Sequence, residues 1–439
     1  MGAFTFNWDL LRGEITKLLQ DLIRINTTNP PGNELGAAIY LRDFLQREGI
    51  ASTIYEAEPG RANLVARLPG SGTGKPLILL GHTDVVTADP GSWRYDPFAG
   101  TVADEFIWGR GALDMKGMLA MEVMALVLLK RAGITPPRET ILLAVADEEA
   151  GGTMGMGWLI EQDIPGLKEA EYVINEGGVG MVSAGIPVFS CQSAEKGLLW
   201  VKLSFPGRPG HASMPADDNA ILKMAKVLQR IIGFKRPITL CETTRIYLKE
   251  LANLQGLSLA GQTALDYSLK LFAARHLQAE RSIQAMLYHT ISPTIVRAGT
   301  KANVLPDKCE LTLDCRLLPG ETPGHFLEEI QKHVNDPAVE YEIIQAADPT
   351  ESSPHTPLFA TIANVLRQEM PQSLLVPSLT PTATDSRFFR YRGIAAYGFM
   401  PVLISEEELQ RMHGIDERLS LANLEQGTRV LYEVLRQLA

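Results

Sequence analysis

The sequence predicts an α/β protein with a doubly wound, mostly parallel sheet into which a smaller α+β domain is inserted. Short apolar runs at residues 77–80, 141–146 and 172–174 alternate with helical patterns. This alternation is typical of a parallel sheet that helices cover on both faces. From Gly197 onward the segments alternate between apolar and polar residues, as in half-exposed strands. After residue 348 the pattern of short apolar runs and helices returns, which indicates that the middle segment is an insertion.

The first domain is predicted to begin with two helices. Apolar residues recur at helical spacing over residues 10–25, and the segment NTTNPPG ends this helix before a second one at residues 34–48. A further helix at residues 116–131 separates the first two strands. Its apolar stretch spans about a dozen residues and includes Glu122, whereas a membrane-spanning helix needs about 20 apolar residues. We therefore expect a core helix.

The chain is long enough for two domains. It has 439 residues, of which 45% are hydrophobic, and one hydrophobic core rarely serves so many. We predict that residues 1–195 and 349–439 form the two parts of the first domain, and that residues 196–348 form the inserted one.

Two strands and several helices are predicted in the insertion. Residues 199–205 (LWVKLSF) and 309–315 (CELTLDC) alternate like half-exposed strands, a helix is expected at residues 217–232, and residues 246–288 are mostly helix-like. The last part of the chain then supplies a helix, a buried strand and a terminal amphipathic helix, at residues 359–368, 394–400 and 421–438.

The composition of the chain argues against some classes of partner and indicates a cellular compartment. The chain carries 41 basic and 51 acidic residues, a net charge of -10, which argues against binding a nucleic acid backbone. The N-terminal sequence resembles no secretory signal, and no membrane partner is expected. Four cysteines without C-x-x-C spacing indicate reduced, buried thiols, as in a cytoplasmic protein: Cys191, Cys241, Cys309 and Cys315.

Polar side chains follow the apolar runs of the first domain. Because the carboxyl ends of parallel strands share one edge of a sheet, and ligands bind at that edge, we expect these side chains to meet there. Asp114 in GALDMKG and His413 in MHGIDER would join them from loops on the same side. The residues at the strand ends are His82 and Asp84, then Asp147, Glu148 and Glu149, then Glu176.

Each of these residues also has a purely structural interpretation. A single histidine after a strand is usually a hydrogen-bonded structural residue, and an acid at a strand end is usually a solvated cap. Glu148 and Glu149 would then be a charged loop, and His413 would belong to a surface ion-pair cluster with its acidic and basic neighbours Asp416, Glu417 and Arg418. Together, however, two imidazoles and several carboxylates at one edge favour zinc or a similar divalent ion.

The motifs GHTDVV, WGRGALDMKG, DEEAGG, NEGG, GHAS and MHGIDER resemble those of the co-catalytic zinc amidohydrolases. That family includes aminoacylase, carboxypeptidase G, acetylornithine deacetylase and succinyl-diaminopimelate desuccinylase. The resemblance extends over nearly the whole chain. It implies that the first domain is a zinc-hydrolase catalytic domain and that the insertion is a lid or dimerisation domain.

The resemblance also implies a ligand set for two Zn²⁺ ions, with Co²⁺ or Mn²⁺ as possible substitutes. Asp114 would bridge the two ions. His82 and Glu176 would complete the protein ligands of one ion, and Glu149 and His413 would complete those of the other.

Three further residues resemble catalytic residues of the family. Glu148 matches the general base, which takes a proton from the attacking water and returns it to the leaving amine. Asp84 would accept a hydrogen bond from the His82 ring and fix its tautomer. His211 in GHAS resembles a histidine that crosses the interface of a homodimer to the tetrahedral intermediate. As an alternative, His211 is an ordinary residue at the start of a helix.

Substrate contacts are implied for Asn303 in KANVLPD and Arg316 in DCRLLPG, which resemble residues that hold a carboxylate or carbonyl oxygen. Arg387 in TATDSRFF is a candidate clamp for a carboxylate, which a guanidinium binds through two nitrogens. One region departs from the compact members. Residues 234–288 form a segment that is longer and more helical than the lid of compact members such as the desuccinylase. The segment resembles the enlarged lid of carboxypeptidase S and its animal relatives that cleave N-acyl amino acids. This departure leaves the dimer geometry open.

The predicted function is hydrolysis of an amide bond next to a free α-carboxylate, in a small N-acyl amino acid or a short peptide. The sequence leaves open whether the protein is an aminoacylase or a carboxypeptidase or dipeptidase. Acetylornithine deacetylase and succinyl-diaminopimelate desuccinylase activities are alternatives, as is a single-metal or non-zinc hydrolase. A non-catalytic homologue that binds metal or peptide is another alternative, although such a protein would not need Glu148.

Overall fold

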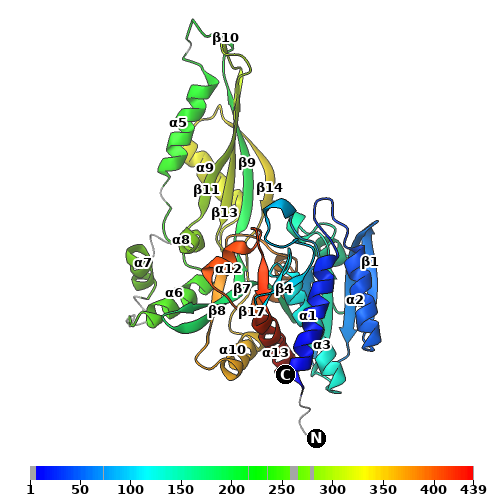
Figure 1. Ribbon diagram of the computed structural model, residues 1–439. Coiled ribbons are helices and arrows are strands. Elements are labelled where there is room, and N and C mark those ends of the chain that lie inside the picture. The colour runs from blue at the N-terminus through cyan, green and yellow to red at the C-terminus, as the bar shows by residue number, and fades with distance from the viewer. Residues whose placement is uncertain are drawn as a thin grey trace. The chain divides into compact units, whose positions relative to one another are not determined.

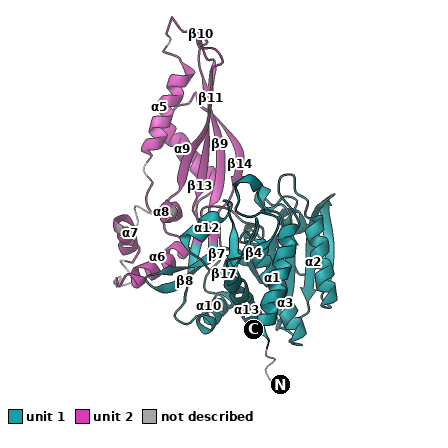
Figure 2. Cartoon of the chain, in the orientation of Figure 1, with its two compact units in different colours: residues 1–193, 352–378, 384–439 teal, residues 194–351, 379–383 magenta. Residues whose placement is uncertain are grey.

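The computed structural model describes residues 6–72, 74–215, 217–234, 236–257, 265–276 and 281–438. The chain forms two compact units (Figure 2), one of residues 1–193, 352–378 and 384–439 and the other of residues 194–351 and 379–383. The predicted domain limits, between residues 195 and 196 and between residues 348 and 349, are not tested by this division into units and stay a prediction. Within the predicted helical segment 246–288, residues 258–264 and 277–280 lie outside the described residues.

The main sheet has parallel strands at its centre and antiparallel strands towards its edges. β6, β3, β7 and β17 are parallel neighbours, while β1, β2 and β8 pair antiparallel with theirs. This arrangement confirms the predicted α/β class with a mostly parallel centre. In sheet order the strands are β1 (Ala51–Glu58), β2 (Arg61–Leu68), β6 (Arg138–Val145), β3 (Gly74–His82), β7 (Tyr172–Ser183), β17 (Ala395–Leu403), β8 (Ile186–Glu195) and β15 (Thr350–Glu351), with β16 (Leu374–Thr380) paired to β8.

Both faces of this sheet are buried, which explains why its central strands are continuous apolar runs. In β3, Leu77 and Leu79 pack into one hydrophobic cluster, and Ile78 and Leu80 pack into a second one, because successive side chains of a strand point to opposite faces. The helices of the first unit (Figure 1) are α1 (Trp8–Arg24), α2 (Leu35–Arg47), α3 (Lys116–Arg131), α4 (Met156–Leu159), α10 (Pro357–Glu369), α11 (Ser386–Arg390), α12 (Glu406–Arg411) and α13 (Leu421–Gln437).

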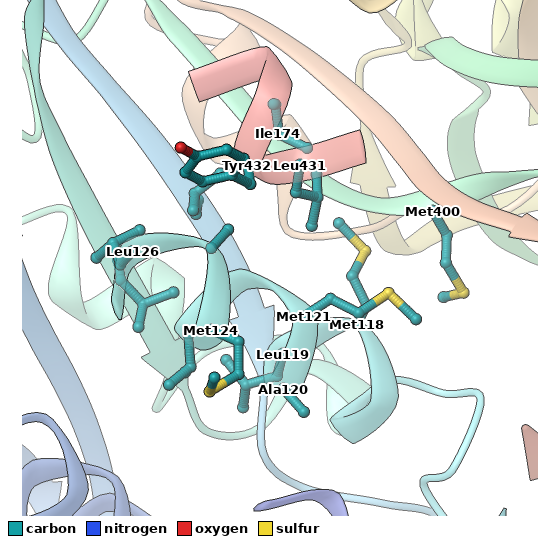
Figure 3. Packing of buried hydrophobic residues seen from close by; sticks show 14 of the residues in the cluster. Met118, Leu119, Ala120, Met121, Met124, Leu126, Ile174, Met400, Leu431 and Tyr432 are labelled. Atoms are coloured by element: carbon teal, nitrogen blue, oxygen red, sulfur yellow. The ribbon is translucent and has the colours of Figure 1, made fainter. Parts of the chain in front are cut away.

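Helix α3 is buried along almost its whole length, as predicted for a core helix. Its methionines Met118, Met121 and Met124 pack among apolar residues of the same cluster (Figure 3). At its first turn, Lys116 Nζ donates hydrogen bonds to the carbonyl oxygens of Leu22 and Ile25 at the end of α1. This contact anchors the start of α3, and therefore the loop that precedes it.

Glu122 is the exception in this apolar helix. Its carboxylate is fully buried and has no hydrogen-bond partner among the described residues. Burial raises the pKa of Glu122 well above its ordinary value, because an apolar environment disfavours the charged form.

A small antiparallel sheet completes the first unit. It contains β4 (Thr101–Ala103), β5 (Phe106–Trp108) and β18 (Arg418–Ser420), which pair in the order β18-β5-β4. The Arg418 guanidinium lies over the rings of Phe106 and Trp108. The pairing of β5 with β18 joins a segment near residue 108 to one near residue 418.

The second unit contains a four-stranded antiparallel sheet in the order β11-β13-β9-β14. Every second residue of β13 is buried, and this apolar face packs against α5 and α9. Helix α5 starts three residues later than predicted, since the side chain of Asn219 caps it by accepting the Ile221 N–H at 2.8 Å. The strands are β9 (Gly197–Pro206), β11 (Thr290–Ala298), β13 (Lys308–Leu317) and β14 (Glu340–Ala347), with a separate pair, β10 (Gly210–His211) and β12 (Val304–Leu305). The helices are α5 (Ala220–Gly233), α6 (Glu242–Leu254), α7 (Leu265–His276), α8 (Arg281–Leu287) and α9 (Pro323–Val334).

All four cysteines belong to the described part of the chain and are free thiols; three are buried and Cys241 is partly buried. Within the described ranges, no helix is both long enough and apolar enough to cross a membrane.

Candidate metal centre

The first group of ligand candidates gathers where β3 ends beside β7, a strand that continues past Glu176 instead of ending before it as predicted. β3 ends at His82, and its parallel neighbour β7 carries Glu176. Asp114 reaches them from the loop before α3. Nε2 of His82 lies 3.1 Å from Oδ1 of Asp114 and 3.4 Å from Oε2 of Glu176. All three side chains are at most 13% exposed, so the group is shielded from solvent.

The second group shares Asp114 with the first. Nε2 of His413 lies 2.9 Å from Oδ2 of Asp114 and 3.1 Å from Oε1 of Glu149. Glu149 follows β6 in a short 3-10 turn (Glu148–Ala150), and His413 lies in the loop between α12 and β18. The His413 side chain is 51% exposed, so this side of the centre is open to solvent.

Asp114 therefore presents one carboxylate oxygen to each imidazole. In both groups, one ligand atom from each of the three residues lies within 4.8 Å of the others. Imidazole nitrogens and carboxylate oxygens are the donor set that suits zinc and similar divalent ions. The geometry thus fits a pair of cations that share one carboxylate, and it brings together all five predicted metal ligands.

The pKa values report a strongly negative local potential. Hydrogen bonds to Asp114 and Glu149 raise the pKa of His413 to about 10. Burial alone would lower the pKa of His82, but Glu176, Asp114 and Asp84 outweigh it and raise that pKa well above its ordinary value. Burial raises the pKa of Glu176 to about 7. Carboxylates that stabilise positive charge on nearby imidazoles will also attract divalent cations.

Asp84 contacts both His82 and the loop of the two glutamates. Nδ1 of His82 lies 2.9 Å from the main-chain carbonyl oxygen of Asp84 and 3.5 Å from its Oδ1, so the main-chain carbonyl is the closer acceptor. The Asp84 carboxylate also accepts the N–H groups of Glu148 and Glu149, each at 3.2 Å. A single buried side chain thus ties the end of β3 to the turn after β6.

The turn that carries Glu148 has an unusual start. Asp147 has a φ of 69°, in the left-handed region that non-glycine residues rarely adopt. Its carboxylate accepts hydrogen bonds that hold it there, from Arg61 at 2.7 Å, Met154 N at 3.0 Å, Thr153 at 3.1 Å and Asn29 at 3.2 Å. Burial and the charge of Glu176 raise the pKa of Glu148, which increases its affinity for a proton.

Two acidic residues near the centre were missed as parts of the site. Glu417 is completely buried and bonds to the loop that carries Asp114, so the surface ion-pair alternative is wrong for this residue. Asp385 is 1% exposed, and its carboxylate has no hydrogen-bond partner in the described part of the chain. Burial raises the pKa of Asp385 to about 7. In the sequence, the only indication that Asp385 belongs to the site is its position two residues before Arg387, a predicted site residue.

Arg387 lies beside the turn that carries Glu148 and Glu149. Its Nη2 donates to the carbonyl oxygen of Gly151 at 2.7 Å, and its Nη1 donates to that of Thr384 at 3.0 Å. Both contacts are to main-chain carbonyls. A guanidinium has five N–H donors, so Arg387 can also donate to a substrate carboxylate.

The remaining predicted residues belong to the second unit. His211 and Asn303 lie together, because β10 pairs with β12 and Ala212 N donates to the Asn303 carbonyl oxygen at 3.0 Å. The exposed His211 ring contacts Ser213, with Nδ1 2.6 Å from the hydroxyl oxygen. Arg316 is near the other end of β13 and forms an ion pair with Asp314 at 2.7 Å. The unit therefore separates Arg316 from the other two residues.

The fold and the site define a metal-dependent hydrolase. More specifically, the chain belongs to peptidase family M20/M25/M40, whose profile matches residues 78–437. It is an M20-family hydrolase of the peptidase or aminoacylase type, and this result confirms the resemblance that the motifs indicated.

Several relatives that carry the names of hydrolases support this placement. The chain is 28% identical over 371 residues to "Probable carboxypeptidase S-like 2" of Dictyostelium discoideum, with 82% of this chain and 71% of that protein covered. It is 28% identical to the human "N-fatty-acyl-amino acid synthase/hydrolase PM20D1" over 82% of this chain and 74% of the relative. It is 27% identical to "Aminoacylase-1" of Sus scrofa over 96% of this chain and 94% of that protein.

Solved structures share the fold. An M20 family metallo-carboxypeptidase, Sso-CP2 of Sulfolobus solfataricus, superposes with a TM-score of 0.71 at 20% identity, covering 96% of this chain and 98% of that one. The YXEP protein of Bacillus subtilis, described as a dinuclear metal-binding peptidase of the M20 family, gives a TM-score of 0.62 at 13% identity, covering 98% of this chain and 100% of that one. At these identities the likeness concerns the fold.

Proposed function

We propose that this protein hydrolyses an amide bond next to a free α-carboxylate, in an N-acyl amino acid or a short peptide, with two Zn²⁺ ions and Glu148 as general base. One observation carries this proposal: the two carboxylate oxygens of Asp114 face two different imidazoles, at 3.1 Å from His82 and 2.9 Å from His413. The names of the relatives, which specify carboxypeptidase, N-fatty-acyl-amino acid hydrolase and aminoacylase, support the substrate class.

The residues of the chain divide the work of the reaction. When bound, two divalent ions make water more acidic and polarise a carbonyl group. Glu148 accepts the proton of the attacking water and later donates it to the leaving amine. The raised pKa of Glu148 suits this second step, because a stronger base keeps the proton until it is donated to the leaving amine. Asp84 holds Glu148 and Glu149 in place through their N–H groups.

We assign Arg387 to the substrate carboxylate, because its guanidinium lies next to the turn of Glu148 and can donate to a charged acceptor as well as to main-chain carbonyls. A charge-assisted bond of this kind is stronger than a neutral one. Asn303 and Arg316 are assigned to the substrate's carboxylate or carbonyl oxygen. In the free protein, Asp314 occupies the fork of Arg316.

The separation of these residues supports a homodimer. Arg316 pairs with Leu198 at one end of β9, and Lys308 pairs with Pro206 at the other end. Eight residues of strand correspond to about 26 Å, and the pair of strands carrying His211 lies beyond Pro206. One copy of the unit therefore cannot direct both Arg316 and His211 to one small substrate. We propose that the second copy supplies His211 and Asn303, which lie together.

The surface of the second unit offers a place for such a partner. Ile221, Ala225 and Ile232 form an exposed stripe on α5, about 100° around the helix from the buried face that packs on the sheet. β11 is an edge strand of the same unit, and its Ile295 and Val296 are exposed. An exposed apolar stripe and an unpaired strand edge are features through which protein copies associate.

Mixing two inactive variants tests the crossing histidine. We expect His211→Ala and His413→Ala each to have little activity, and a mixture of the two, after subunit exchange, to regain up to about a quarter of the native sites by random pairing of subunits. Activity and mass of the mixed dimers are the measurements. Intact mixed dimers without recovered activity would exclude a catalytic residue from the partner.

A substrate screen tests the activity itself. Purified protein is stripped with a chelator, resupplied with Zn²⁺, Co²⁺ or Mn²⁺, and offered N-acetyl amino acids, long-chain N-acyl amino acids and dipeptides. We expect metal-dependent hydrolysis in at least one series, and a rate at least about 10-fold lower for matched amides that lack the α-carboxylate, since they lose a charge-assisted contact. Hydrolysis that survives chelation, or that ignores the carboxylate, would refute the proposal.

The screen, extended by acetylornithine and succinyl-diaminopimelate and combined with a count of bound ions per chain, separates the alternatives. Hydrolysis restricted to acetylornithine or succinyl-diaminopimelate would favour those activities. Two bound ions without hydrolysis would favour a binding protein, and one bound ion with hydrolysis would favour a single-metal enzyme. We propose a cytoplasmic location, which the four free thiols support.

A further inference from the structure

We infer that Glu417 and Arg110 form a positioning pair for the second group of metal ligands. The pair fixes Asp114 and His413 relative to each other, so that the site of Asp114, Glu149 and His413 depends on it more than the site of His82, Asp114 and Glu176 does. This inference rests on the proposed two-metal function. Glu417 and Arg110 belong to neither group of ligand candidates.

Glu417 organises the loop that presents Asp114. Its Oε1 accepts the N–H groups of Leu113 at 2.8 Å and Asp114 at 2.9 Å, and its Oε2 accepts the N–H of Gly111 at 3.1 Å. The side chain is fully buried. Three main-chain donors therefore converge on one carboxylate, as in an anion-binding loop, and they hold the backbone of Asp114 itself.

Arg110 connects this loop to the loop of His413. Its Nη1 lies 2.6 Å from Oε2 of Glu417, and its Nη2 donates to the carbonyl oxygen of Gly414 at 2.8 Å. The side chains of the pair are 2% and 0% exposed. Gly414 is the residue directly after His413, so one guanidinium spans the segments that carry the two ligands.

The loop of His413 needs such support. His413 and Asp416 have φ angles of 59° and 58°, in the left-handed region that costs a non-glycine residue free energy unless its surroundings hold it there. His413 is also the most exposed ligand. Its neighbours in the loop, Gly414 and Glu417, are held by Arg110.

The two sites depend on the pair to different extents. In the first site only Asp114 comes from a loop that Glu417 holds, because His82 ends β3 and Glu176 lies within β7. In the second site both Asp114 and His413 come from the bonded loops. Losing the pair should therefore weaken the second site more.

Metal content measures this difference without reference to activity. The full-length protein and the variants Glu417→Ala, Glu417→Gln and Arg110→Met are loaded with Zn²⁺, dialysed against graded concentrations of free Zn²⁺ and analysed for bound zinc per chain. We expect native protein to bind two ions. In Glu417→Ala the second ion should bind about 10- to 100-fold more weakly, the range for losing a partner that orients ligands, and the first ion less than about 10-fold more weakly.

The other variants keep the test informative if Glu417→Ala does not fold. Glu417→Gln retains one acceptor oxygen but turns an amide donor towards other donors, and Arg110→Met keeps the main-chain bonds of Glu417. Both should lose affinity for the second ion to a smaller degree. Leu45→Ala removes a fully buried side chain of α2 and serves as a control for general destabilisation, with two ions retained.

Equal weakening of both ions in the Glu417 and Arg110 variants, or unchanged binding of both, would overturn the inference. So would loss of the second ion in Leu45→Ala. Failure of the proposed function would look different: native protein would bind two ions yet hydrolyse nothing, and the zinc measurements would still decide the role of the pair. Native protein that binds fewer than two ions would refute the two-metal proposal and this inference together.

Discussion

Glu148→Gln should fold, bind two metal ions and lose at least about 100-fold in turnover, the lower limit typical of removing a general base. Gln has the same shape as Glu but cannot accept the proton of the attacking water. Glu148 is absent from both groups of ligand candidates, and its contact with Asp84 runs through its main-chain N–H. Turnover and bound zinc per chain are the measurements.

Two controls belong with this variant. Glu149→Gln, one residue further on, should weaken the second ion, because Oε1 of Glu149 lies 3.1 Å from Nε2 of His413 within the second group. Glu161→Gln, which lies in the same unit and pairs with Arg392 on the surface, should change neither property. Normal turnover in Glu148→Gln, or loss of metal from it, would contradict its role as base.

Asp114→Ala should remove both ions and abolish measurable hydrolysis. Asp114 is the residue that both ligand groups share, and its oxygens are divided between His82 and His413. Removing it leaves two ligands in each group, fewer than the three or four protein ligands of ordinary zinc sites. Bound metal per chain and turnover at saturating zinc are the measurements.

His413→Ala is the matched comparison for Asp114→Ala. It removes a ligand from the second group only, so one ion should remain bound to the first. If Asp114→Ala also retained one tightly bound ion, Asp114 would serve a single site and the shared carboxylate would be wrong.

Much of the catalytic unit was predictable because strand ends leave a readable pattern. The apolar run before His82 is the end of β3, and the run before Glu176 is the part of β7 that pairs with β3 in parallel. β7 continues to Ser183, so Glu176 follows the paired segment and not the end of its strand. Asp114 and His413 follow no such rule, since both come from loops. Their place at this edge of the sheet could be predicted only by assuming that their loops lie on the same side of the sheet as the strand ends. Their roles came from the resemblance of the motifs.

The supporting contacts were not predictable from pattern. Glu417 and Asp147 accept main-chain N–H groups from residues that are distant in sequence or in a turn, and a side chain that satisfies such donors has no periodicity. An acidic residue beside other charges in MHGIDER therefore resembled a surface residue. The main-chain partners of Arg387 were missed for the same reason.

The order of the ligands along the chain has a consequence for biosynthesis. His82, Asp114 and Glu176 all precede the second unit, whereas His413 and Glu417 follow it, and β17, the strand beside β7, is also encoded after it. The ribosome therefore synthesises the whole second unit before it reaches His413, a ligand of the proposed second site. The proposed second site can thus form only after His413 has been synthesised, and until then the nascent chain lacks a complete two-metal centre.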